Sequence, residues 1–426
     1  MAGITREENE LLTRTGPGTP MGRLFREYWI PAMFSERLPE PDGAPVAIQL
    51  LGERLVAFRD TKGRVGLLDE YCPHRRASLV YGRNEECGLR CVYHGWKFDV
   101  AGKLLETPAE RNPDFGKSIR QTSYPTREAG GIIWTYMGPE AAPPPFPDFL
   151  FTKLPSQQVI GFHYNMNCNY LQAIEGDLDM SHPSFLHGTI VQSGPAVEHM
   201  PTMAHDSQPQ TIVQEDWFGL QTVSKWKSPD PGKSMIWVDP FIMPFHTIVP
   251  ARRTNFRFVW HAWVPIDDVS HWLYYVHYDP EVPPGPDEKR MLGEVFGHDL
   301  IDPANNWRSR ATLQNMHLID RKQQKTSSYS GIRGIAAQDV ALLESMGPLV
   351  DRSQQVLGSE DVIIAQLRRY LLKVVRDYMA GKKPPALDGR RSFADIDSRS
   401  IMVPRDTTVQ EVLKHREWRW GDIATA

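Results

Sequence analysis

The chain has 426 residues, enough for about two to three domain-sized units. An apolar content of 41% and a mean hydropathy of −0.43 describe an ordinary globular composition. A net charge of −4 and a pI near 6.4 argue against a nucleic-acid-binding surface. No run approaches the ~20 apolar residues that span a bilayer, and the first ten residues lack the apolar core of a signal peptide.

The first third of the chain predicts a leader and a small β domain. Residues 1–40 are expected to form a helical leader, with a short helix over Met21–Trp29. Short β-like runs separated by Gly, Asn and Asp then predict a β domain over residues 41–145. These runs are Val46–Phe58, Gly63–Asp69, Leu89–Val100 and Gly131–Met137.

A Pro-rich stretch at 139–147 predicts an extended connector to a second domain over residues 146–426. This part has longer strand-like runs rich in aromatic and β-branched residues, followed by two helical patterns. The strands are expected at 210–226, 234–248, 253–265 and 271–278, and the helices near 285–297 and 360–380. The segment 318–340, rich in Lys, Gln, Ser and Gly, predicts a loop, either mobile or an ordinary surface connection.

Two short motifs in the β domain each offer one thiolate and one imidazole. Cys72-Pro-His74-Arg is followed by Cys91-Val-Tyr-His94. A [2Fe–2S] cluster with two Cys on one iron and two His on the other needs this set. A structural zinc site uses the same residue types, so both readings remain open from these residues alone. The remaining two cysteines are too few for a disulfide framework, which favours reduced thiols and a cytoplasmic protein.

A second constellation lies in the stretch from Asn169 to His187. Apolar residues at helical spacing predict a helix up to His182, because Pro183 disfavours helical backbone at the residue before it. Asp179 would then lie on the same helix face as His182.

Two histidines and a carboxylate form the facial triad of non-heme Fe(II) oxygenases. His182 and His187 are the imidazole candidates, and Glu175, Asp177, Asp179 and a more distant acid compete to be the carboxylate. An acidic, solvated helix face is the alternative reading.

Together the motifs resemble the terminal oxygenase (alpha) component of the Rieske non-heme iron aromatic-ring-hydroxylating oxygenases. The resemblance is carried by Cys-Pro-His-Arg, Cys-x-Tyr-His-Gly-Trp-Lys-Phe-Asp and Cys-Asn-Tyr-Leu-Gln…Glu-Gly-Asp-Leu-Asp…His…Phe-Leu-His, and it is strongest to the phthalate and phenoxybenzoate dioxygenase group. It implies an α+β fold: an antiparallel Rieske β domain, then a helix-grip catalytic domain whose antiparallel sheet wraps around a long helix. It also implies that Cys72, His74, Cys91 and His94 hold the [2Fe–2S] cluster.

The resemblance also implies roles in the second constellation. His182 and His187 would bind a mononuclear Fe(II), with Asp361 as the third ligand and Glu360 as its rival by position. Asp179 would be a catalytic bridge, contacting His182 and, across a subunit interface, His94. Because the two metals of one chain are expected to lie too far apart, this bridge requires a ring of subunits.

The implied reaction uses O2 and electrons from NAD(P)H, delivered by a flavin or ferredoxin-type reductase, to hydroxylate a small aromatic carboxylate or aryl ether during aromatic catabolism. A homotrimer or stacked trimers are expected, without nucleic-acid or membrane partners. An O-demethylase or monooxygenase is the alternative, and a Rieske electron carrier without oxygenase activity is a further one. Candidate pocket residues are Met235, Trp237, Phe241, Met243, Phe245 and His246, with Arg252, Arg253 and Arg257 nearby.

Overall fold

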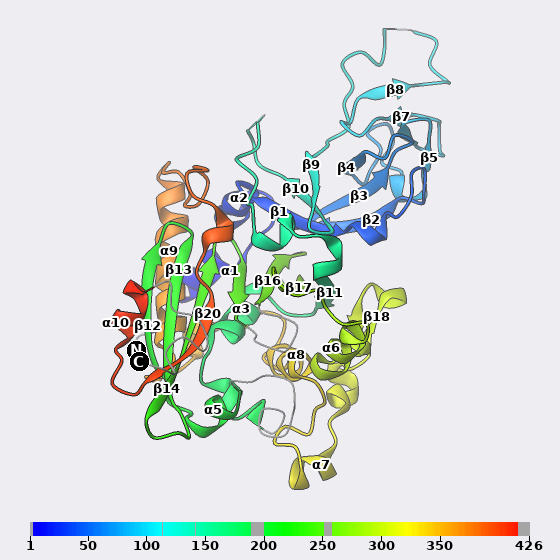
Figure 1. Cartoon of the computed structure of the whole chain (residues 1–426). Coiled ribbons are helices and arrows are strands. Elements are labelled where there is room, and N and C mark those ends of the chain that lie inside the picture. Colours follow the sequence, from blue (N-terminus) through cyan, green and yellow to red (C-terminus); the bar gives the residue numbers. More distant parts are fainter. Residues whose placement is uncertain (1–2, 113, 141, 189–199, 251–257, 416–426) are drawn as a thin grey trace. The chain divides into compact units, whose positions relative to one another are not determined.

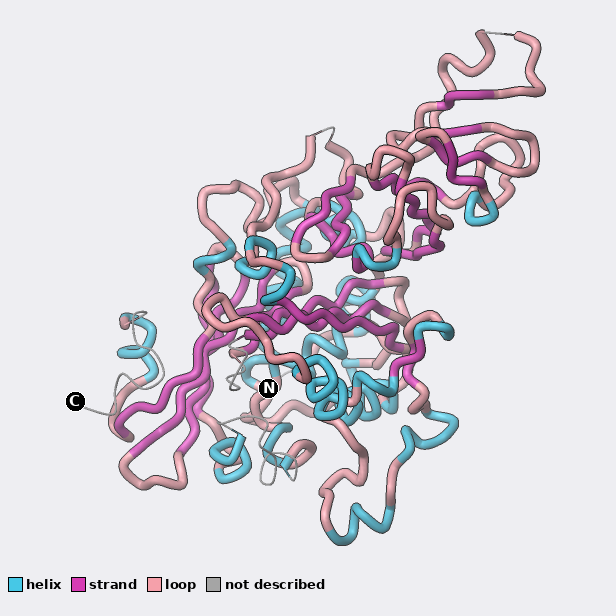
Figure 2. Tube along the Cα trace, turned by 45° about the vertical axis from the view of Figure 1, so that its right-hand side comes forward, coloured by secondary structure: helices cyan, strands magenta, loops and turns pink. Residues whose placement is uncertain are grey.

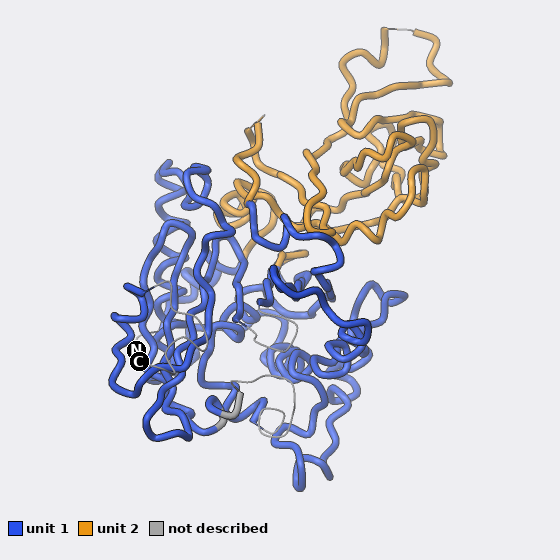
Figure 3. The backbone as a smooth tube through the Cα atoms, viewed as in Figure 1, with its two compact units in different colours: residues 1–13, 148–263, 268–426 blue, residues 14–147, 264–267 orange. Residues whose placement is uncertain are grey.

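The computed structural model describes residues 3–112, 114–140, 142–188, 200–250 and 258–415 (Figure 1). The chain divides into two compact units (Figure 3). The smaller contains residues 14–147 and 264–267, and the larger contains residues 1–13, 148–263 and 268–426. The change from one unit to the other at residue 148 directly follows the Pro-rich segment. Among the described residues, no helix is long and apolar enough to cross a membrane.

The smaller unit contains three small antiparallel sheets. They are β1(Trp29–Phe34)–β10(Ile132–Tyr136)–β9(Thr126–Ala129), β2(Val46–Leu50)–β3(Glu53–Arg59)–β4(Val65–Asp69), and β5(Arg83–Glu85)–β6(Gly88–Arg90)–β7(Lys97–Phe98)–β8(Leu104–Glu106). The predicted leading helix is α2(Pro20–Arg26), which ends before β1. Cys72 and Cys91 lie in the buried core of this unit with Phe58, Trp96 and Phe98. The loops that carry the two motifs are therefore fixed at one end by their cysteines.

The larger unit is built on an eight-stranded antiparallel sheet, whose long strands lie side by side in Figure 2. The order is β11(Val159–Met166), β17(His271–Tyr278), β16(Phe258–Pro265), β15(His246–Val249), β14(Lys233–Ile242), β13(Gly219–Lys227) and β12(Gln210–Asp216), with β20(Arg399–Pro404) also paired to β14. The central strands are almost wholly buried, which explains their aromatic and β-branched composition. The small β sheets followed by this sheet and its helices confirm the predicted α+β class.

Helices pack around the sheet in the larger unit. The long α9(Val362–Met379) contacts β12, α1(Arg6–Thr13) and α3(Tyr170–Leu178). A buried ion-pair network ties these segments together: Arg352 and Arg368 both donate to Glu175 on α3, with the shortest N–O distances at 2.9 and 2.7 Å. The α6(Glu288–Phe296), α7(Arg321–Thr326), α8(Ile335–Ser345), α5(Met200–His205) and α10(Val409–Lys414) helices and the short β18(Ile301–Asp302)–β19(Arg308–Ser309) pair complete the unit.

Several local predictions were wrong. The strands expected at 210–226 and 234–248 are each divided into two, β12 with β13 and β14 with β15. The helix expected up to His182 ends at Leu178, because Asp179 is extended (φ −72°, ψ 110°) and its side chain accepts a hydrogen bond from the Ser181 N–H at 2.8 Å. The segment 318–340 is not a continuous loop, since α7 and the start of α8 lie within it. The apolar residues Ile335, Ala336, Val340 and Leu343 give α8 a buried face that the polar composition of the preceding stretch concealed.

Candidate metal centres and substrate cavity

The two motif loops of the smaller unit have the same backbone design. The N–H of Cys72 donates to the carbonyl of Ala77 at 2.9 Å, and the Arg76 N–H donates back to the Cys72 carbonyl at 2.8 Å. In the second loop, the Cys91 N–H donates to the Trp96 carbonyl at 2.8 Å and the Gly95 N–H donates to the Cys91 carbonyl at 2.9 Å. The fifth residue of each loop has a positive φ, 59° at Arg76 and 78° at Gly95, which closes the turn.

These loops bring like residues together. The buried Cys72 and Cys91 thiols interact, and burial raises the pKa of Cys72 to about 11 despite hydrogen bonds from the backbone N–H groups of His74 and Arg75. The His74 and His94 rings lie 4.5 Å apart between centroids, and Trp96 stacks on His74 at 4.5 Å. Desolvation, with the neighbouring His74, lowers the pKa of His94, which favours the neutral imidazole that binds a metal.

The pairing fits a two-iron cluster better than a single zinc ion. A tetrahedral zinc site would bring at least three of the four ligand atoms together. In the described part of the chain, the group of three or more such side chains with ligand atoms within 4.8 Å of one another contains none of these four residues. A cysteine pair with an adjacent histidine pair matches one iron with two thiolates and a second with two imidazoles.

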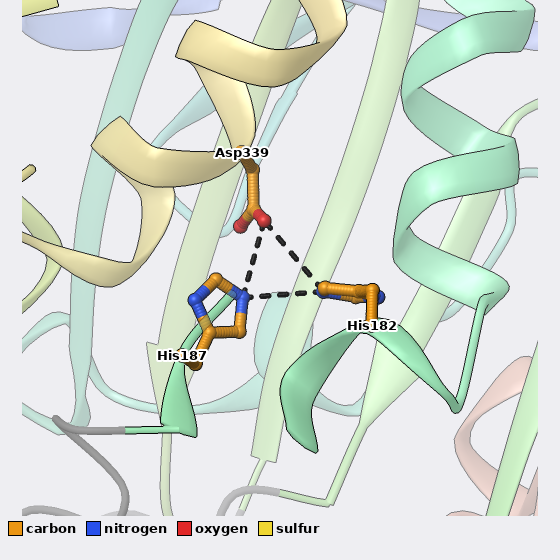
Figure 4. A group of neighbouring side chains, drawn as sticks. All are labelled: His182, His187 and Asp339. Atoms are coloured by element: carbon orange, nitrogen blue, oxygen red, sulfur yellow. Dashed lines mark hydrogen bonds and ion pairs between the residues drawn. The ribbon is translucent and has the colours of Figure 1, made fainter. Parts of the chain in front are cut away.

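That compact group consists of His182, His187 and Asp339, in the larger unit (Figure 4). The Nε2 atoms of the two histidines are 3.1 Å apart. Asp339 Oδ1 lies 3.1 Å from Nε2 of His187 and 3.6 Å from Nε2 of His182. His182 begins a short helical turn, His187 follows it, and Asp339 reaches in from α8.

Outer hydrogen bonds hold both imidazoles in the orientation that a metal needs. Nδ1 of His182 donates to the backbone carbonyl of Asp179 at 2.7 Å. Nδ1 of His187 donates to Oε1 of Gln338 at 2.7 Å, and the Gln338 amide is fixed in turn by Ser330 Oγ at 2.8 Å and the Ile332 carbonyl at 2.7 Å. Since Nδ1 carries the hydrogen in each ring, the Nε2 lone pairs face the centre.

The electrostatics of the two histidines differ. Burial and the neighbouring His187 lower the pKa of His182. Burial also acts to lower the pKa of His187, but the Asp339 carboxylate outweighs it and raises that pKa above its ordinary value. The carboxylate therefore attracts positive charge to the point where the three ligand atoms meet. A dication with a preference for nitrogen and oxygen ligands fits this set.

The triad lies in the wall of a cavity of about 140 Å³. Most of the lining is apolar or aromatic, including Met166, Met180, Trp237, Trp263, Phe296 and Leu343. The polar groups in the lining include Tyr164, Asp177, Asp179, His261 and Tyr275. An apolar cavity with a few placed polar groups is typical of a binding site for a small organic molecule.

Comparisons with known proteins agree with both halves of this description. Residues 28–125 match the Rieske [2Fe–2S] domain, and residues 135–422 match the family described as LigXa C-terminal domain like. The chain is 35% identical over 424 residues to the 3-chlorobenzoate-3,4-dioxygenase oxygenase subunit of Comamonas testosteroni, covering 96% of this chain and 98% of the relative. It is 33% identical over 430 residues to the phthalate 4,5-dioxygenase oxygenase subunit of Pseudomonas putida, covering 98% and 97%.

The chain belongs to the Rieske non-heme iron oxygenases. A further relative, the 5,5'-dehydrodivanillate O-demethylase oxygenase subunit of a Sphingobium strain, is 41% identical over 399 residues, covering 90% of this chain and 83% of the relative. Dicamba monooxygenase bound to dicamba has the same fold at a TM-score of 0.57 and 18% identity, covering 84% of this chain and 99% of that structure. An oxygenase–ferredoxin complex of carbazole 1,9a-dioxygenase gives 0.58 and 18%, covering 90% and 99%.

This Rieske oxygenase is therefore an oxidoreductase, the terminal oxygenase of a system acting on aromatic compounds, with a [2Fe–2S] cluster. The family implies a mononuclear iron site as well.

The structure does not bring the expected third carboxylate to the histidine pair. Asp361 lies at the start of α9, where its side chain accepts the Gly358 N–H at 2.7 Å, and it is not part of the compact group. Asp339 takes that place. The expectation for Asp361 came from the family resemblance, because an acidic residue at a helix start is by itself a feature that many helices share. A sequence signal for Asp339 did exist, since it is an acid flanked by Ala336, Val340 and Leu343 on the apolar face of a helix.

Other expectations about the Rieske oxygenase site have mixed outcomes. Of the predicted pocket residues, Trp237 lines the cavity, while the remaining five are buried elsewhere in the larger unit. The arginines at 252, 253 and 257 lie outside the described residues. The backbone carbonyl of Asp179 holds His182, whereas its carboxylate Oδ2 is 3.9 Å from His182 Nδ1. Gln338 and His261 were not identified from the sequence, and Asp177 was named only as a candidate for the triad carboxylate.

Proposed function

We propose that this oxygenase adds oxygen from O2 to a single-ring aromatic carboxylate, using electrons that originate from NAD(P)H. The observation that carries the proposal is the triad of His182, His187 and Asp339 in the wall of the cavity of about 140 Å³. We assign these three residues as the ligands of a mononuclear Fe(II). When bound there, Fe(II) supplies the one-electron chemistry that O2 requires, beside the position of the substrate.

The second part of the proposal concerns the electron entry site. We assign Cys72 and Cys91 to one iron of the Rieske cluster and His74 and His94 to the other. The cysteines are buried, whereas His74 is exposed and His94 is half-buried. This difference supports a cluster whose histidine side faces the surface, where a reductase or a neighbouring subunit can approach it.

The third part concerns transfer from one metal to the other. We propose that the Asp179 carboxylate links His182 to His94 of the partner subunit, within a homotrimer or stacked trimers. The Asp179 side chain supports this role because about 31% of it is exposed, while its own backbone carbonyl already orients His182 at 2.7 Å. Because Oδ1 of Asp179 accepts the Ser181 N–H, the other oxygen, Oδ2, is the one available for a group that comes from outside the unit.

Cavity size and lining support the substrate class. An apolar cavity of about 150 Å³ accommodates benzene, so the observed volume suits one ring and a small substituent. The aromatic side chains of Trp237, Trp263 and Phe296 suit a flat ring. The relatives named for 3-chlorobenzoate and phthalate act on single-ring carboxylates by those names.

A second candidate activity is O-demethylation of a single-ring methoxybenzoate. It is favoured by the 41% identity to an O-demethylase oxygenase subunit. The metal set would be the same, and the outcome would depend on which carbon the cavity places beside the iron.

A substrate screen with the holoenzyme tests the proposal. Iron analysis should give about three irons per chain, against about two for an electron carrier, and dithionite should bleach the visible absorption of the cluster, which zinc would lack. With a compatible reductase, O2 uptake should depend on a single-ring acid. Ring-hydroxylated products would support hydroxylation and formaldehyde would support demethylation. An iron-loaded enzyme that oxygenates two-ring or uncharged aromatics but no single-ring acid would refute the substrate class.

A further inference from the structure

A second histidine–carboxylate pair lies in the cavity, apart from the metal triad. Nδ1 of His261, on β16, is 3.0 Å from Oδ1 of Asp177, which is on α3. The other carboxylate oxygen, Oδ2, accepts the hydroxyl of Thr247 at 2.7 Å. Both His261 and Asp177 line the cavity, and the His261 side chain is only about 6% exposed.

The hydrogen bonds define how His261 is oriented. A carboxylate that accepts a hydroxyl on one oxygen offers a lone pair to the imidazole with the other, so Nδ1 of His261 carries the hydrogen and donates. Its other nitrogen, Nε2, is buried and has no hydrogen-bond partner among the residues that the structure describes. A buried polar atom without a partner is costly unless something in the cavity satisfies it.

This combination distinguishes His261 from the other buried histidines. His271 also has a ring nitrogen without a hydrogen-bond partner among the described residues, but neither His271 nor His246 nor His277 lines this cavity. Burial lowers the pKa of His246 to about 3 and of His271 to about 4, so both are neutral core residues. Of the cavity-lining histidines in the described residues, His182 and His187 belong to the triad, which leaves His261 for the ligand.

We propose that His261 binds the carboxylate of the aromatic substrate and is the positioning residue that selects aromatic acids. The inference rests on the proposed function, because it assigns the group that this same cavity recognises. When the acid binds, His261 takes up a proton, and its Nε2–H donates to the substrate carboxylate while Nδ1–H continues to donate to Asp177. The imidazolium then lies between two carboxylates, and Asp177 compensates its charge in the buried site.

The surrounding residues favour this assignment over a neutral ligand group. Tyr275 and Trp263 contact the His261 ring edge-to-face, with centroid distances of 4.2 and 5.4 Å, and fix its plane. No lysine or arginine is found among the described residues that line the cavity. The protonated His261 is therefore the cation that the cavity lining offers to an acid. Its position sets the distance between the aromatic ring of the substrate and the triad.

The test compares an acid with neutral compounds of nearly the same shape. Dissociation constants of 3-chlorobenzoate, 3-chloroacetophenone and 3-chlorophenol are measured with the iron-loaded, reduced enzyme in the absence of O2. We expect the native enzyme to bind the acid at least ~10-fold more tightly than the ketone, as for a charge-assisted hydrogen bond in a dry site. His261→Phe and His261→Asn should lose this preference, with ketone affinity within about two-fold of the native value.

Two further variants separate positioning from folding. Asp177→Asn should weaken the preference for the acid, because the imidazolium loses its compensating charge. His277→Gln, on the adjacent strand β17, is the matched control and should keep the preference. Unchanged iron content in each variant shows that the fold is intact.

The inference is overturned if the His261 variants keep the native preference, if the native enzyme does not distinguish the acid from the ketone, or if it prefers the phenol. These results differ from failure of the proposed function. An enzyme that turns over aromatic acids but binds them independently of His261 retains the function and loses the inference, whereas absence of turnover with any single-ring acid removes the function.

Discussion

Replacing Asp339 is the sharpest test of the mononuclear site. Asp339→Ala removes the carboxylate whose Oδ1 lies 3.1 and 3.6 Å from the two histidine Nε2 atoms. The remaining imidazoles would then hold a metal with two protein ligands, and His187 would lose the charge that raises its pKa. Loss of an outer hydrogen-bonding partner typically lowers metal affinity by about 10–100-fold, so loss of a direct ligand should exceed that range.

The expected readout is iron content together with activity. The Asp339→Ala enzyme should fall from about three irons per chain to about two, with an unchanged cluster spectrum. The value of kcat/KM should fall by more than ~100-fold, equivalent to about 2.7 kcal/mol. Asp361→Ala is the matched control: it removes one hydrogen bond to the Gly358 N–H and should keep about three irons. An Asp339→Ala enzyme that retains all its iron, or an Asp361→Ala enzyme that loses it, would refute the assignment.

Three further predictions follow from the same structure. Gln338→Ala should weaken iron binding by about 10–100-fold in a chelator competition. Gln338→Glu keeps an acceptor for His187 and should bind iron nearly normally. Equal iron affinity of the two variants would contradict the role of Gln338 in orienting His187. Asp179→Asn should keep both metal centres but lose nearly all coupled oxygenation in O2-uptake and product assays, and full activity would exclude the bridge. Glu175→Gln should lower the free energy of unfolding by about 3–5 kcal/mol in urea titrations, because two buried arginines lose their partner. The exposed Glu215→Gln, which removes a surface ion pair, should cost less than ~1 kcal/mol, and similar losses for both would contradict the burial argument.

The Glu175 prediction also has a defined pH dependence. Burial alone would raise the pKa of Glu175, but Arg352 and Arg368 outweigh it and hold the pKa below its ordinary value. A carboxyl group with a lower pKa in the folded state stabilises the protein above the ordinary carboxyl range, near pH 4.3. That contribution is lost as the pH falls through the folded-state pKa. The difference in unfolding free energy between the native protein and Glu175→Gln should therefore shrink in acid, and a constant difference down to pH 3 would refute the argument.

The chain alone identified the features that depend on short spacing. Cys72 and His74 are two residues apart, and Cys91 and His94 are three residues apart. Each motif can therefore be recognised within a few neighbouring residues. The pair of His182 and His187 is equally local. The periodicity of apolar residues predicted strands after residue 210 and a long helix near 360–380. The observed helix, α9, spans Val362–Met379. The α+β class followed from these elements together with the family resemblance.

The carboxylate that lies beside the two histidines could not be predicted from local sequence. Asp339 and Asp361 are both acids on helical segments, and neither has a motif around it. Which of them meets the histidines depends on how α8 packs against α3, a contact between segments about 160 residues apart in sequence. Hydrogen bonding settles it further: Gln338, beside Asp339, holds His187 at 2.7 Å, while Asp361 closes its own turn.

Sequence motifs thus indicated which residue types carry the chemistry, and their resemblance to a family indicated two metal centres in one chain. Which distant side chains lie beside these motifs follows only from the packing of the folded chain. Asp339 joins the histidines, and Asp177 and His261, 84 positions apart, face one cavity. The positions of metal ligands and the hydrogen bonds inside a cavity depend on how separate elements pack against one another. Sequence spacing records neighbours along one helix or loop, whereas the packing of helices on the sheet determines which of many similar acids and histidines are buried together.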